Sequence, residues 1–522
     1  MIVVDCETDR NANMIMIGVA SDIKYQNFEQ IDKKYYYNFF KNTTDFYNFL
    51  KQEKIKEIFC HNLEYDFFKI YEARRENIKF CGYYSTAGLS YIQQGVIIWK
   101  DMHNHLPFSL EHIGNLIGVK KIKIDYDKIT MVNEELIKYN KRDCLITIVT
   151  LDIIKRIYRE LGMEKIKSTS GSQAMQLYLR KFFCANFKKV KKKHIDIWRK
   201  GYKGGWVEVF LPGEYKNDTY YKIDINSIFP MMMMTSLPLY YNFRIQKSLS
   251  EYERKYTYWL GIRKDEYGEY DVFNSIENRY GRGDYYYLFP IKVYPFLNYV
   301  KFLYRKKETS TGLKKQIYKK LLNSLYGKFG QLDNVDIITN YNYKKSKNIY
   351  YDEQIIGNLH RIKKYDSKSK FWVNIIWSLF ITAKARKYMK NLYYFLAKKG
   401  FDIFYVDTDA FIIKGNIEKI KHCINNNKIG LFKIEDMSNE IDIRGKKMYR
   451  FGEVSRCIED CKKCKLKDCI YKCKGVPIEY RKMFFENGYV QFEKFAKFKE
   501  SLKQGYKIGE KIQMIKSNKS NI

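Results

Sequence analysis

The chain has 522 residues, of which 45% are hydrophobic and 17% aromatic, so two to four domains with packed cores are expected rather than a disordered polyelectrolyte. Lys and Arg number 95 against 59 Asp and Glu, and the formal net charge of +36 makes nucleic acid the leading partner, with a membrane surface as the competing one. No run of 18 apolar residues appears and residues 1–4 lead into acids rather than a signal peptide, so a soluble, cytoplasmic protein without a membrane partner is expected.

The N-terminal residues predict a strand that carries two carboxylates. Residues 1–4 are apolar, and Asp5 and Glu7 follow two residues apart. Side chains alternate along a strand with period two, so both carboxylates lie on one face. A second short apolar strand, at 58–60, leads to a third acid, Asp66.

Helical periodicity from residue 134 to about residue 154 predicts a helix that carries Tyr139 and Asp143. Their four-residue spacing places the phenol and the carboxylate on one helix face. With the three acids upstream, Asp143 completes a set that could bind two metal ions while the tyrosine orients an attacking water. A solvated charge is the simpler interpretation of any one of these acids, but the ordered set is much less expected by chance.

These segments resemble, in order, the three exonuclease motifs of family B DNA polymerases. The resemblance implies an RNase H-like domain over 1–165 and 3′–5′ hydrolysis, with magnesium or manganese at the four acids and Tyr139 positioning the water. Single-stranded DNA contacts are implied at Thr8, Asn62 and Tyr65. A lysine of 120–123 would stabilise the scissile phosphate, and the sequence does not separate Lys121 from Lys123. The family often carries a Ser/Thr-Leu pair where this chain reads Met102-His103.

Small polar residues at 168–172 predict a boundary, with a polymerase domain over 166–522. Beyond it, Tyr202-Lys203-Gly204-Gly205 follows the basic stretch 188–193. Paired glycines permit close backbone approach to a phosphodiester, and the tyrosine and lysine can stack and neutralise charge. A plain Gly-Gly turn is the simpler interpretation of this motif alone.

Residues 221–230 combine a strand, the carboxylate of Asp224 and a proline-terminated turn. The segment resembles the first palm motif of family B polymerases. The resemblance implies that Asp224 is a catalytic metal ligand and that Ser227 contacts the incoming triphosphate. Phe229 stands where the family usually has tyrosine, and its ring would exclude a ribose 2′-hydroxyl.

Periodicity over 314–330 predicts a helix with Lys319, Asn323 and Tyr326 on one face. The segment closely resembles the fingers-helix motif of the family. Lys319 would then grip the phosphates, while Asn323 and Tyr326 frame the nascent base pair. Further substrate contacts are implied at Lys307, Lys315 and Gly327.

The tripeptide Asp407-Thr408-Asp409 follows the apolar run 401–406. On an extended segment, period two would place both carboxylates on one face; a polar hairpin turn is the simpler interpretation of the motif alone. The tripeptide matches the palm motif that completes a two-metal site with Asp224. The residues implied by the resemblance are Val406, Asp407 and Asp409 as metal ligands; Thr408, Lys447 and Tyr449 at the substrate; and Tyr202, Gly204, Gly205, Thr382 and Arg386 on DNA.

The resemblance spans almost the whole chain and implies an α/β multidomain protein, with an exonuclease domain followed by a right-hand polymerase. The implied parts are a palm over about 166–295 and 372–455, fingers over about 296–330, an insertion at 331–371 and a thumb over about 456–522. The protein-primed branch fits best, with a reduced first insertion within 251–296. Its partners would be primer-template DNA, deoxynucleoside triphosphates and a terminal protein, and the enzyme would be a monomer. Alternatives are a primer-independent relative, a nuclease with a degenerate polymerase half, and a non-catalytic DNA-binding protein.

Five cysteines fall within seventeen residues, namely Cys457, Cys461, Cys464, Cys469 and Cys473. Four thiolates at such gaps can close a tetrahedral zinc site, and the lysines between them would lower the thiol pKa values. Unliganded thiols and a disulfide are the alternatives. The six other cysteines are scattered and are expected to be reduced.

Overall fold

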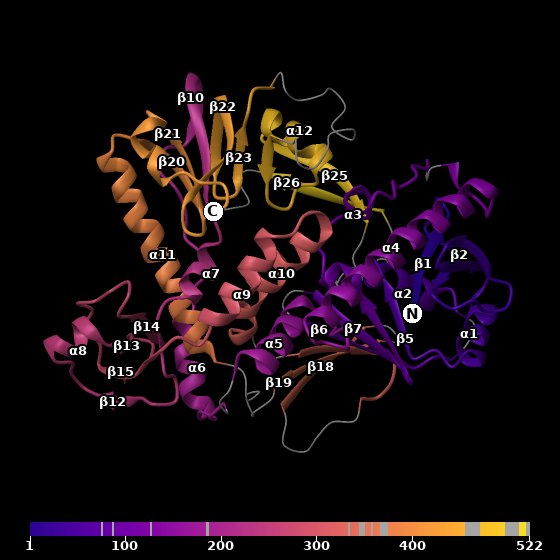
Figure 1. Cartoon of the computed structure of the whole chain (residues 1–522), viewed down its shortest axis with the longest axis horizontal. Helices are drawn as coiled ribbons and strands as arrows, with labels where there is room; N and C mark the ends of the chain where they lie inside the picture. Colours follow the sequence, from indigo (N-terminus) through magenta and orange to yellow (C-terminus); the bar gives the residue numbers. More distant parts are fainter. Residues whose placement is uncertain are drawn as a thin grey trace. The chain divides into compact units, whose positions relative to one another are not determined.

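The computed structural model describes residues 1–74, 77–85, 88–125, 128–183, 187–331, 335–343, 350–356, 359–365, 374–454, 470–495 and 511–517. The chain forms two compact units, each built around its own large sheet (Figure 1). The first unit comprises Met1–Asn186, Lys301–Phe371 and Lys494–Ile512, and the second comprises Phe187–Val300, Trp372–Glu493 and Gln513–Ile522.

The change of unit after Asn186 lies beyond the boundary expected near residue 165. The small polar residues at 168–172 begin helix α5 (Ser170–Lys181) instead of forming a linker. The hydroxyl of Thr169 accepts a hydrogen bond from the Ser172 amide and caps this helix. Small polar residues favour turns and helix N-caps alike, which is why their composition alone did not place the boundary.

The first unit contains an eleven-stranded sheet in the order β18-β19-β17-β6-β7-β8-β5-β1-β2-β4-β3. Its strands are β1 (Ile2–Thr8), β2 (Met14–Ser21), β3 (Glu29–Asp32), β4 (Tyr35–Phe40), β5 (Glu57–Cys60), β6 (Cys81–Ser85), β7 (Gly88–Gln94), β8 (Ile97–Asp101), β17 (Val335–Thr339), β18 (Tyr350–Ile356) and β19 (Leu359–Tyr365). Strands β1, β5 and β8 are parallel, and the remaining pairs of the sheet are antiparallel. The predicted strands at 1–4 and 58–60 are therefore neighbours at the centre of the sheet.

The helices of the first unit pack on this sheet or on one another, and they bury an aromatic core. They are α1 (Thr43–Gln52), α2 (Leu63–Glu72), α3 (Leu110–Ile117), α4 (Glu134–Glu160), α5 and α10 (Gly312–Phe329), with α9 (Leu297–Glu308) leading into the unit. Phe46, Phe68 and Trp99 are fully buried in the core beside β1 and β5. Helix α4 packs on β1 and β2, so the predicted helix at 134–154 lies directly against the strand that carries Asp5.

Within residues 331–371, expected as an insertion in the palm, the described strands β17, β18 and β19 extend the sheet of the first unit. Strand β17 pairs antiparallel with β6, and β19 and β18 follow at the edge of the sheet. The hydroxyl of Thr339 donates to the Phe80 carbonyl at 2.8 Å, and the Asn340 side chain accepts from the Phe80 amide at 3.0 Å. This pairing joins residues about 260 positions apart along the chain.

The second unit contains a seven-stranded sheet in the order β24-β23-β22-β10-β21-β20-β9, with each neighbouring pair antiparallel. The strands are β9 (Val207–Val209), β10 (Gly213–Ile225), β20 (Asp402–Asp407), β21 (Ala410–Lys414), β22 (Phe432–Gly445), β23 (Met448–Phe451) and β24 (Tyr471–Cys473). Helix α7 (Ile228–Met233) follows β10, and the long helix α11 (Ile375–Lys398) precedes β20. The two predicted palm motifs thus lie on β10 and at the end of β20, with β21 between these two strands.

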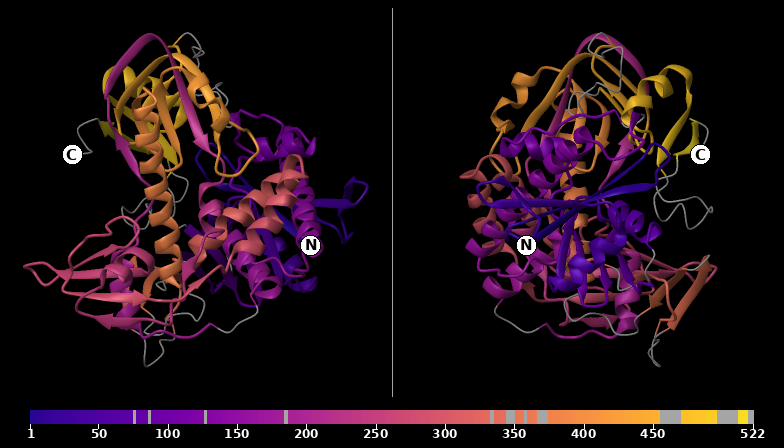
Figure 2. Two further views of the ribbon diagram at one scale, coloured as in Figure 1. Left: turned by 60° about the vertical axis from the view of Figure 1, so that its left-hand side comes forward. Right: turned by 90° about the vertical axis from the view of Figure 1, so that its right-hand side faces the viewer.

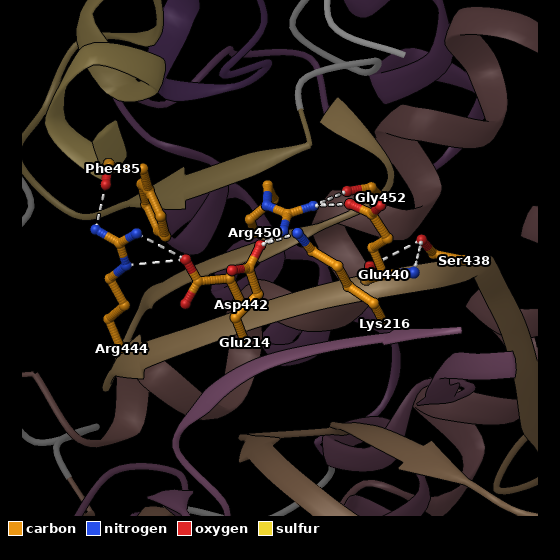
Figure 3. Close-up of polar contacts among 9 residues, drawn as sticks. All are labelled: Glu214, Lys216, Ser438, Glu440, Asp442, Arg444, Arg450, Gly452 and Phe485. Atoms are coloured by element: carbon orange, nitrogen blue, oxygen red, sulfur yellow. Dashed lines mark hydrogen bonds and ion pairs between the residues drawn. The ribbon is translucent and has the colours of Figure 1, made fainter. Parts of the chain in front are cut away.

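A buried arginine braces the β10, β22 and β23 side of this sheet (Figure 3). Arg450 on β23 donates to Glu440 on β22 and to Glu214 on β10, each at 2.8 Å, and to the Gly452 carbonyl. Next to it, Arg444 bonds Asp442 and the carbonyl of Phe485 in helix α12 (Arg481–Asn487). These contacts connect three strands and one helix through charged hydrogen bonds.

The region 251–296, expected to be a reduced insertion, lies largely in a compact antiparallel sheet in the order β12-β15-β13-β14. Its strands are β12 (Arg244–Gln246), β13 (Tyr258–Lys264), β14 (Tyr270–Asn274) and β15 (Tyr285–Phe289), with the short helix α8 (Glu251–Tyr256). Helix α11 runs between this small sheet and the seven-stranded sheet of the same unit (Figure 2). Phe380 of α11 contacts the rings of Tyr258 and Phe289 in the small sheet.

The C-terminal part includes a two-stranded sheet of β25 (Tyr489–Phe495) and β26 (Lys511–Ser517). The predicted zinc ligands Cys457, Cys461, Cys464 and Cys469 lie outside the described residues. Cys473 ends β24 and is buried in an apolar cluster. Across the described parts of the chain, no helix has the length and apolar character to cross a bilayer.

Candidate active sites

The first unit brings the four N-terminal acids together. Asp5 and Glu7 lie on β1, as period two predicted. Asp66 on α2 accepts a hydrogen bond from the Cys6 amide at 3.1 Å, which fixes its carboxylate beside the same strand. Asn140, one turn before Asp143 on α4, donates to Asp5 Oδ2 at 2.9 Å and to Glu7 Oε1 at 3.1 Å. Two helices and one strand therefore converge on a single acidic cluster.

The acidic cluster has more carboxylates than basic groups around it. Burial raises the pKa of Asp5 well above its usual value, and repulsion by Glu7, Asp66 and Asp143 adds to the rise. Burial likewise raises the pKa of Asp66, although the hydrogen bonds from Cys6 oppose it. The Oδ1 atom of Asp143 is buried and has no hydrogen-bond partner. Carboxylates that repel one another in a buried place suit divalent cations, whose oxygen ligands they would be.

Lys121 is the basic partner of this cluster. Its ammonium group pairs with Asp143 and lies 4.6 Å from the centre of the Tyr139 ring. Burial would lower the pKa of Lys121, but Asp143 and Tyr139 outweigh it and raise that pKa. Lys123 is exposed to solvent, so the structure separates the two lysines that the sequence left equivalent. Tyr139 and Asp143 share one helix face, as their spacing predicted.

The residues expected on single-stranded DNA lie around the same strand and helix. The hydroxyls of Thr8 and Tyr65 are 2.9 Å apart. Asn62 has a left-handed backbone, φ 78°, and its backbone N–H donates to the Asp101 carboxylate at 3.0 Å. Met102, which stands where the resemblance would place a serine or threonine, is fully buried in the 3-10 turn η1 (Met102–Asn104).

Helix α10 of the first unit presents the predicted substrate face. Lys315, Lys319 and Asn323 are exposed along one side, and Tyr326 is half-buried. Burial, together with nearby Lys319 and Lys315, lowers the pKa of Lys307 to about 8. Three ammonium groups that repel one another form a suitable place for a polyanion such as a triphosphate.

In the second unit, strand register aligns Asp224 with Asp407. Asp224 on β10 pairs with Ala410 on β21, and Asp407 on β20 pairs with the same alanine from the other side. Directly opposed residues of neighbouring strands point to one face. The two acids therefore lie in one row on one face of the sheet, as the palm motifs implied.

Asp409 reaches this region by a turn, not by strand alternation. Thr408 and Asp409 form the two-residue turn of the β20–β21 hairpin, and Thr408 has a left-handed backbone with φ 64°. The expectation that an extended Asp-Thr-Asp segment orients both acids was wrong, because the strand ends at Asp407. The hairpin turn was the correct local structure, and it carries the motif.

Asp407 has three neighbours that can donate to it. Lys447 Nζ lies 3.2 Å from Oδ1, the Thr408 hydroxyl 3.1 Å from Oδ1 and the Tyr405 hydroxyl 3.4 Å from Oδ2. The Tyr405 hydroxyl also accepts from the Lys447 amide at 2.9 Å, which holds the left-handed Lys447 in place. The ammonium group of Lys447 thus supplies positive charge beside an acid expected to bind metal.

The remaining substrate candidates surround these strands. Ser227 is left-handed, φ 56°, and directly precedes α7, where Pro230 lies in the first turn rather than in a terminating turn. Val406 is fully buried in the sheet. Tyr449 is buried and its ring centre lies 5.2 Å from that of Tyr405. Among the described residues, no group of three or more His, Cys, Asp or Glu side chains is arranged as a metal site.

Thr382 and Arg386, expected on DNA, are buried in α11. The Thr382 hydroxyl donates to the Leu379 carbonyl of its own helix. Arg386 Nη1 donates to the carbonyls of Lys203 and Gly204 at 2.6 and 2.8 Å, and its other nitrogens bond Glu277. Both side chains are hydrogen-bonded within the protein and buried, so this structure does not place either of them in contact with DNA.

Sequence reasoning missed Asn140, Tyr405 and Glu277. Asn140 stands within the Tyr139–Asp143 motif, and its position one turn before Asp143 could have suggested it. Tyr405 precedes Asp407 by two residues on the same strand face, which is a similar signal. No sequence motif indicates Glu277, because its partner Arg386 lies 109 residues further along the chain.

Comparisons with known proteins agree with this architecture. The family described as DNA polymerase type B, organellar and viral, matches residues 104–262 and 263–404, more than half of the chain. A Podospora anserina protein named "Probable DNA polymerase" is 23% identical over 465 residues, which cover 74% of this chain. The chain spans 38% of that relative's length.

Solved structures of Phi29 DNA polymerase share the fold. The complex with primer-template DNA and incoming nucleotide substrates has a TM-score of 0.72 at 18% identity, and the match covers 99% of each chain. The complex with single-stranded DNA has a TM-score of 0.69 at 19% identity, with 95% of this chain and 96% of that chain covered. The order of elements, the two acidic sites and the family match lead to one conclusion: the chain belongs to the organellar and viral family of type B DNA polymerases.

Proposed function

We propose that the chain is a DNA-directed DNA polymerase with 3′–5′ proofreading exonuclease activity, dependent on magnesium or manganese. The proposal rests on two acidic sites, one in each compact unit. The first gathers the carboxylates of the exonuclease-like motifs, and the second aligns the carboxylates of the two palm motifs. Family membership and the Phi29 fold support the proposal.

For synthesis, Asp224, Asp407 and Asp409 would hold two divalent ions, which when bound stabilise the attacking and leaving oxygens of an in-line displacement. The attacking group is the primer 3′-hydroxyl and the electrophile is the α-phosphorus, with pyrophosphate leaving. Lys319, with Lys307 and Lys315, would neutralise the triphosphate. The ring of Phe229 would exclude a 2′-hydroxyl by its bulk.

For proofreading, Asp5, Glu7, Asp66 and Asp143 would hold the ions. Tyr139 orients the attacking water, and the Lys121 ammonium group stabilises charge on the scissile phosphate. Thr8, Asn62 and Tyr65 would hold the frayed strand. Neutralisation of the crowded acids by the bound ions fits the burial and repulsion that raise the Asp5 pKa.

Primer extension by an Asp224→Asn variant tests the synthetic half. Loss of the carboxylate charge should lower extension at least about a thousandfold, which corresponds to about 4 kcal/mol of transition-state stabilisation, and leave degradation of single-stranded DNA within twofold. Asp218→Asn is the matched control, because Asp218 lies on the same strand and pairs with Lys414 on the surface. Normal extension by Asp224→Asn would refute the assignment.

Initiation is proposed to use a terminal protein whose hydroxyl replaces the primer hydroxyl; a primer-independent start is the alternative. An assay with template, labelled deoxynucleotides and no DNA primer separates them. Label that appears on protein only when a candidate terminal protein is added supports protein priming. Label in free DNA without any added protein supports the alternative.

A further inference from the structure

The loop Tyr202-Lys203-Gly204-Gly205 is bonded to an ion pair between the buried Arg386 and the partly buried Glu277, which come from two distant parts of the second unit. Arg386 Nη1 holds the carbonyls of Lys203 and Gly204. Arg386 Nε donates to Glu277 Oε1 at 2.8 Å, and Nη2 bonds Oε2. Both edges of the guanidinium are used, one on the loop and one on the carboxylate.

Glu277 is itself held in place by the small four-stranded sheet. It follows the last residue of β14, Asn274, whose side-chain oxygen accepts from the amides of Ile276 and Glu277, each at 3.1 Å. The Asn274 side chain also donates to Glu277 Oε2 at 3.0 Å. The small sheet therefore presents the carboxylate to Arg386 in a defined orientation.

The other end of the loop lies against the turn between Asp407 and Asp409. A Cβ atom added to Gly205 would be 2.7 Å from the Thr408 side chain, so a larger residue there would have to displace that side chain. The Thr408 amide donates to the Trp206 carbonyl at 2.7 Å. Thr408 has a left-handed backbone, which a non-glycine residue keeps only when its surroundings impose it.

We propose that Glu277, acting through Arg386, is a positioning residue for the polymerase site. The pair orients the loop so that Gly205 and Trp206 brace the strained Thr408 turn, and the exposed residues Lys203 and Gly204 stay available to primer-template DNA. The inference rests on the proposed polymerase function. It gives the small sheet, which lies outside the catalytic strands, a part in nucleotide transfer.

Geometry explains why the carboxylate is required and not only the arginine. A guanidinium has its five donors in one rigid plane, so a bidentate carboxylate on one edge fixes the direction of the other edge. Without Glu277, Arg386 can rotate away from the two carbonyls, and a loop with two adjacent glycines has little intrinsic order. The Thr408 turn then loses its outer support.

Charge and geometry make opposite predictions for removal of Glu277. Loss of one negative charge near a polyanion should strengthen DNA binding if only electrostatics matters. Loss of the positioning contact should weaken it, because the loop no longer presents a defined surface. The sign of the change in primer-template affinity therefore distinguishes the two.

The test compares Glu277→Ala and Glu277→Gln with the control Asp271→Asn. Asp271 lies on β14 of the same sheet and pairs with Arg263 at 2.7 Å on the surface, away from the Arg386 pair. For each variant, kcat and KM for nucleotide, the Kd for primer-template DNA and the rate of single-strand degradation are measured. We expect Glu277→Ala to weaken primer-template binding and lower kcat for extension, each by tenfold or more, with degradation within twofold.

Glu277→Gln keeps one acceptor and the side-chain shape, so it should recover part of the loss; Asp271→Asn should match the wild type. Unchanged or tighter DNA binding by Glu277→Ala overturns the inference while leaving the polymerase assignment intact. Equal loss of extension and degradation, with a lowered melting temperature, overturns it too, since that result indicates a purely structural pair. Absence of extension by the wild type would instead refute the proposed function.

Discussion

Asn140 is a neutral amide placed between two carboxylates of the exonuclease-like cluster. Its nitrogen donates to Asp5 and Glu7, its oxygen accepts from the Tyr37 hydroxyl at 2.8 Å, and it is fully buried. Gly18 leaves room for it, because a Cβ there would be 1.7 Å from the Asn140 oxygen. Such a contact holds the acids apart at a defined spacing without neutralising them.

We expect Asn140→Ala to lower the rate of single-strand degradation by about 10- to 100-fold, the range seen when a residue that orients metal ligands is removed. Extension of a matched primer by the same preparation should be unchanged. Thr150→Val is the control, because Thr150 is buried on the same helix and its hydroxyl donates to the Ile146 carbonyl within that helix. Degradation by Asn140→Ala at the wild-type rate would show that the amide does not position the acids.

His105 couples the stability of the first unit to pH. It is buried, its Nε2 donates to the Lys167 carbonyl at 2.8 Å and its Nδ1 accepts from the Tyr158 hydroxyl at 2.9 Å. Burial lowers the His105 pKa from 6.5 to about 4. The unfolded chain therefore binds this proton more readily than the folded one, and the stability contributed by the neutral ring is lost as pH falls from about 6.5 towards 4.

Between pH 7.5 and pH 5 this difference costs about 2 kcal/mol of unfolding free energy. Denaturant unfolding of the wild type and of His105→Gln at both pH values measures it. The wild type should lose about 2 kcal/mol more than the variant, because other groups titrate equally in both proteins. Identical pH dependence in the two proteins would mean that His105 does not stay neutral.

At the level of strands and helices, Arg450 connects β10, β22 and β23 (Figure 3). Arg450→Met keeps the aliphatic stem and leaves Glu440 without its buried partner, which should lower the unfolding free energy of the second unit by about 3 kcal/mol. This loss is measured as faster hydrogen exchange of the amides in β22 and β23 under mild denaturant.

Lys216→Met is the matched control for Arg450→Met. Lys216 pairs with the same Glu214 at 3.2 Å, but both side chains are about half exposed. A surface ion pair of this kind contributes about 0.5 kcal/mol or less, so exchange should barely change. Equal effects of the two substitutions would show that burial of Arg450 is not the source of its contribution.

The sequence predicted elements best where the pattern was local. Period two placed Asp5 and Glu7 on one strand face, and helical spacing placed Tyr139 with Asp143. The prediction from period two was wrong for Asp409. The left-handed Thr408 ends the strand, and the residue type alone does not indicate that this backbone conformation occurs. The sequence could not separate Lys121 from Lys123, since only the position of Asp143 decides between them.

Pairings between distant segments were beyond the sequence. Strand β17 joins β6 through Thr339 and Asn340, and no periodicity encodes a partner about 260 residues away. The same holds for Glu277 and Arg386. Glu277 does not lie within a recognisable motif, so only the structure identifies its contact with Arg386.

For the whole molecule, a net charge of +36 predicts steeply salt-dependent DNA binding. The logarithm of affinity should fall with the logarithm of salt concentration by about 0.9 for each phosphate neutralised. Lys319→Ala should leave this slope unchanged while raising the KM for nucleotide by about 10- to 100-fold, because we assign Lys319 to the triphosphate and charged hydrogen bonds contribute about 1.5–3 kcal/mol. A slope reduced by about one would assign Lys319 to the DNA backbone instead.

The two acidic sites should be separable in one enzyme. The most direct measurement follows a primed template with magnesium, scoring extension with nucleotides and 3′–5′ degradation without them, for the wild type, Asp409→Ala and Asp66→Ala. We predict that Asp409→Ala abolishes extension and spares degradation, and that Asp66→Ala does the reverse. Extension that survives Asp409→Ala, or degradation that survives Asp66→Ala, would contradict the assignment of that site.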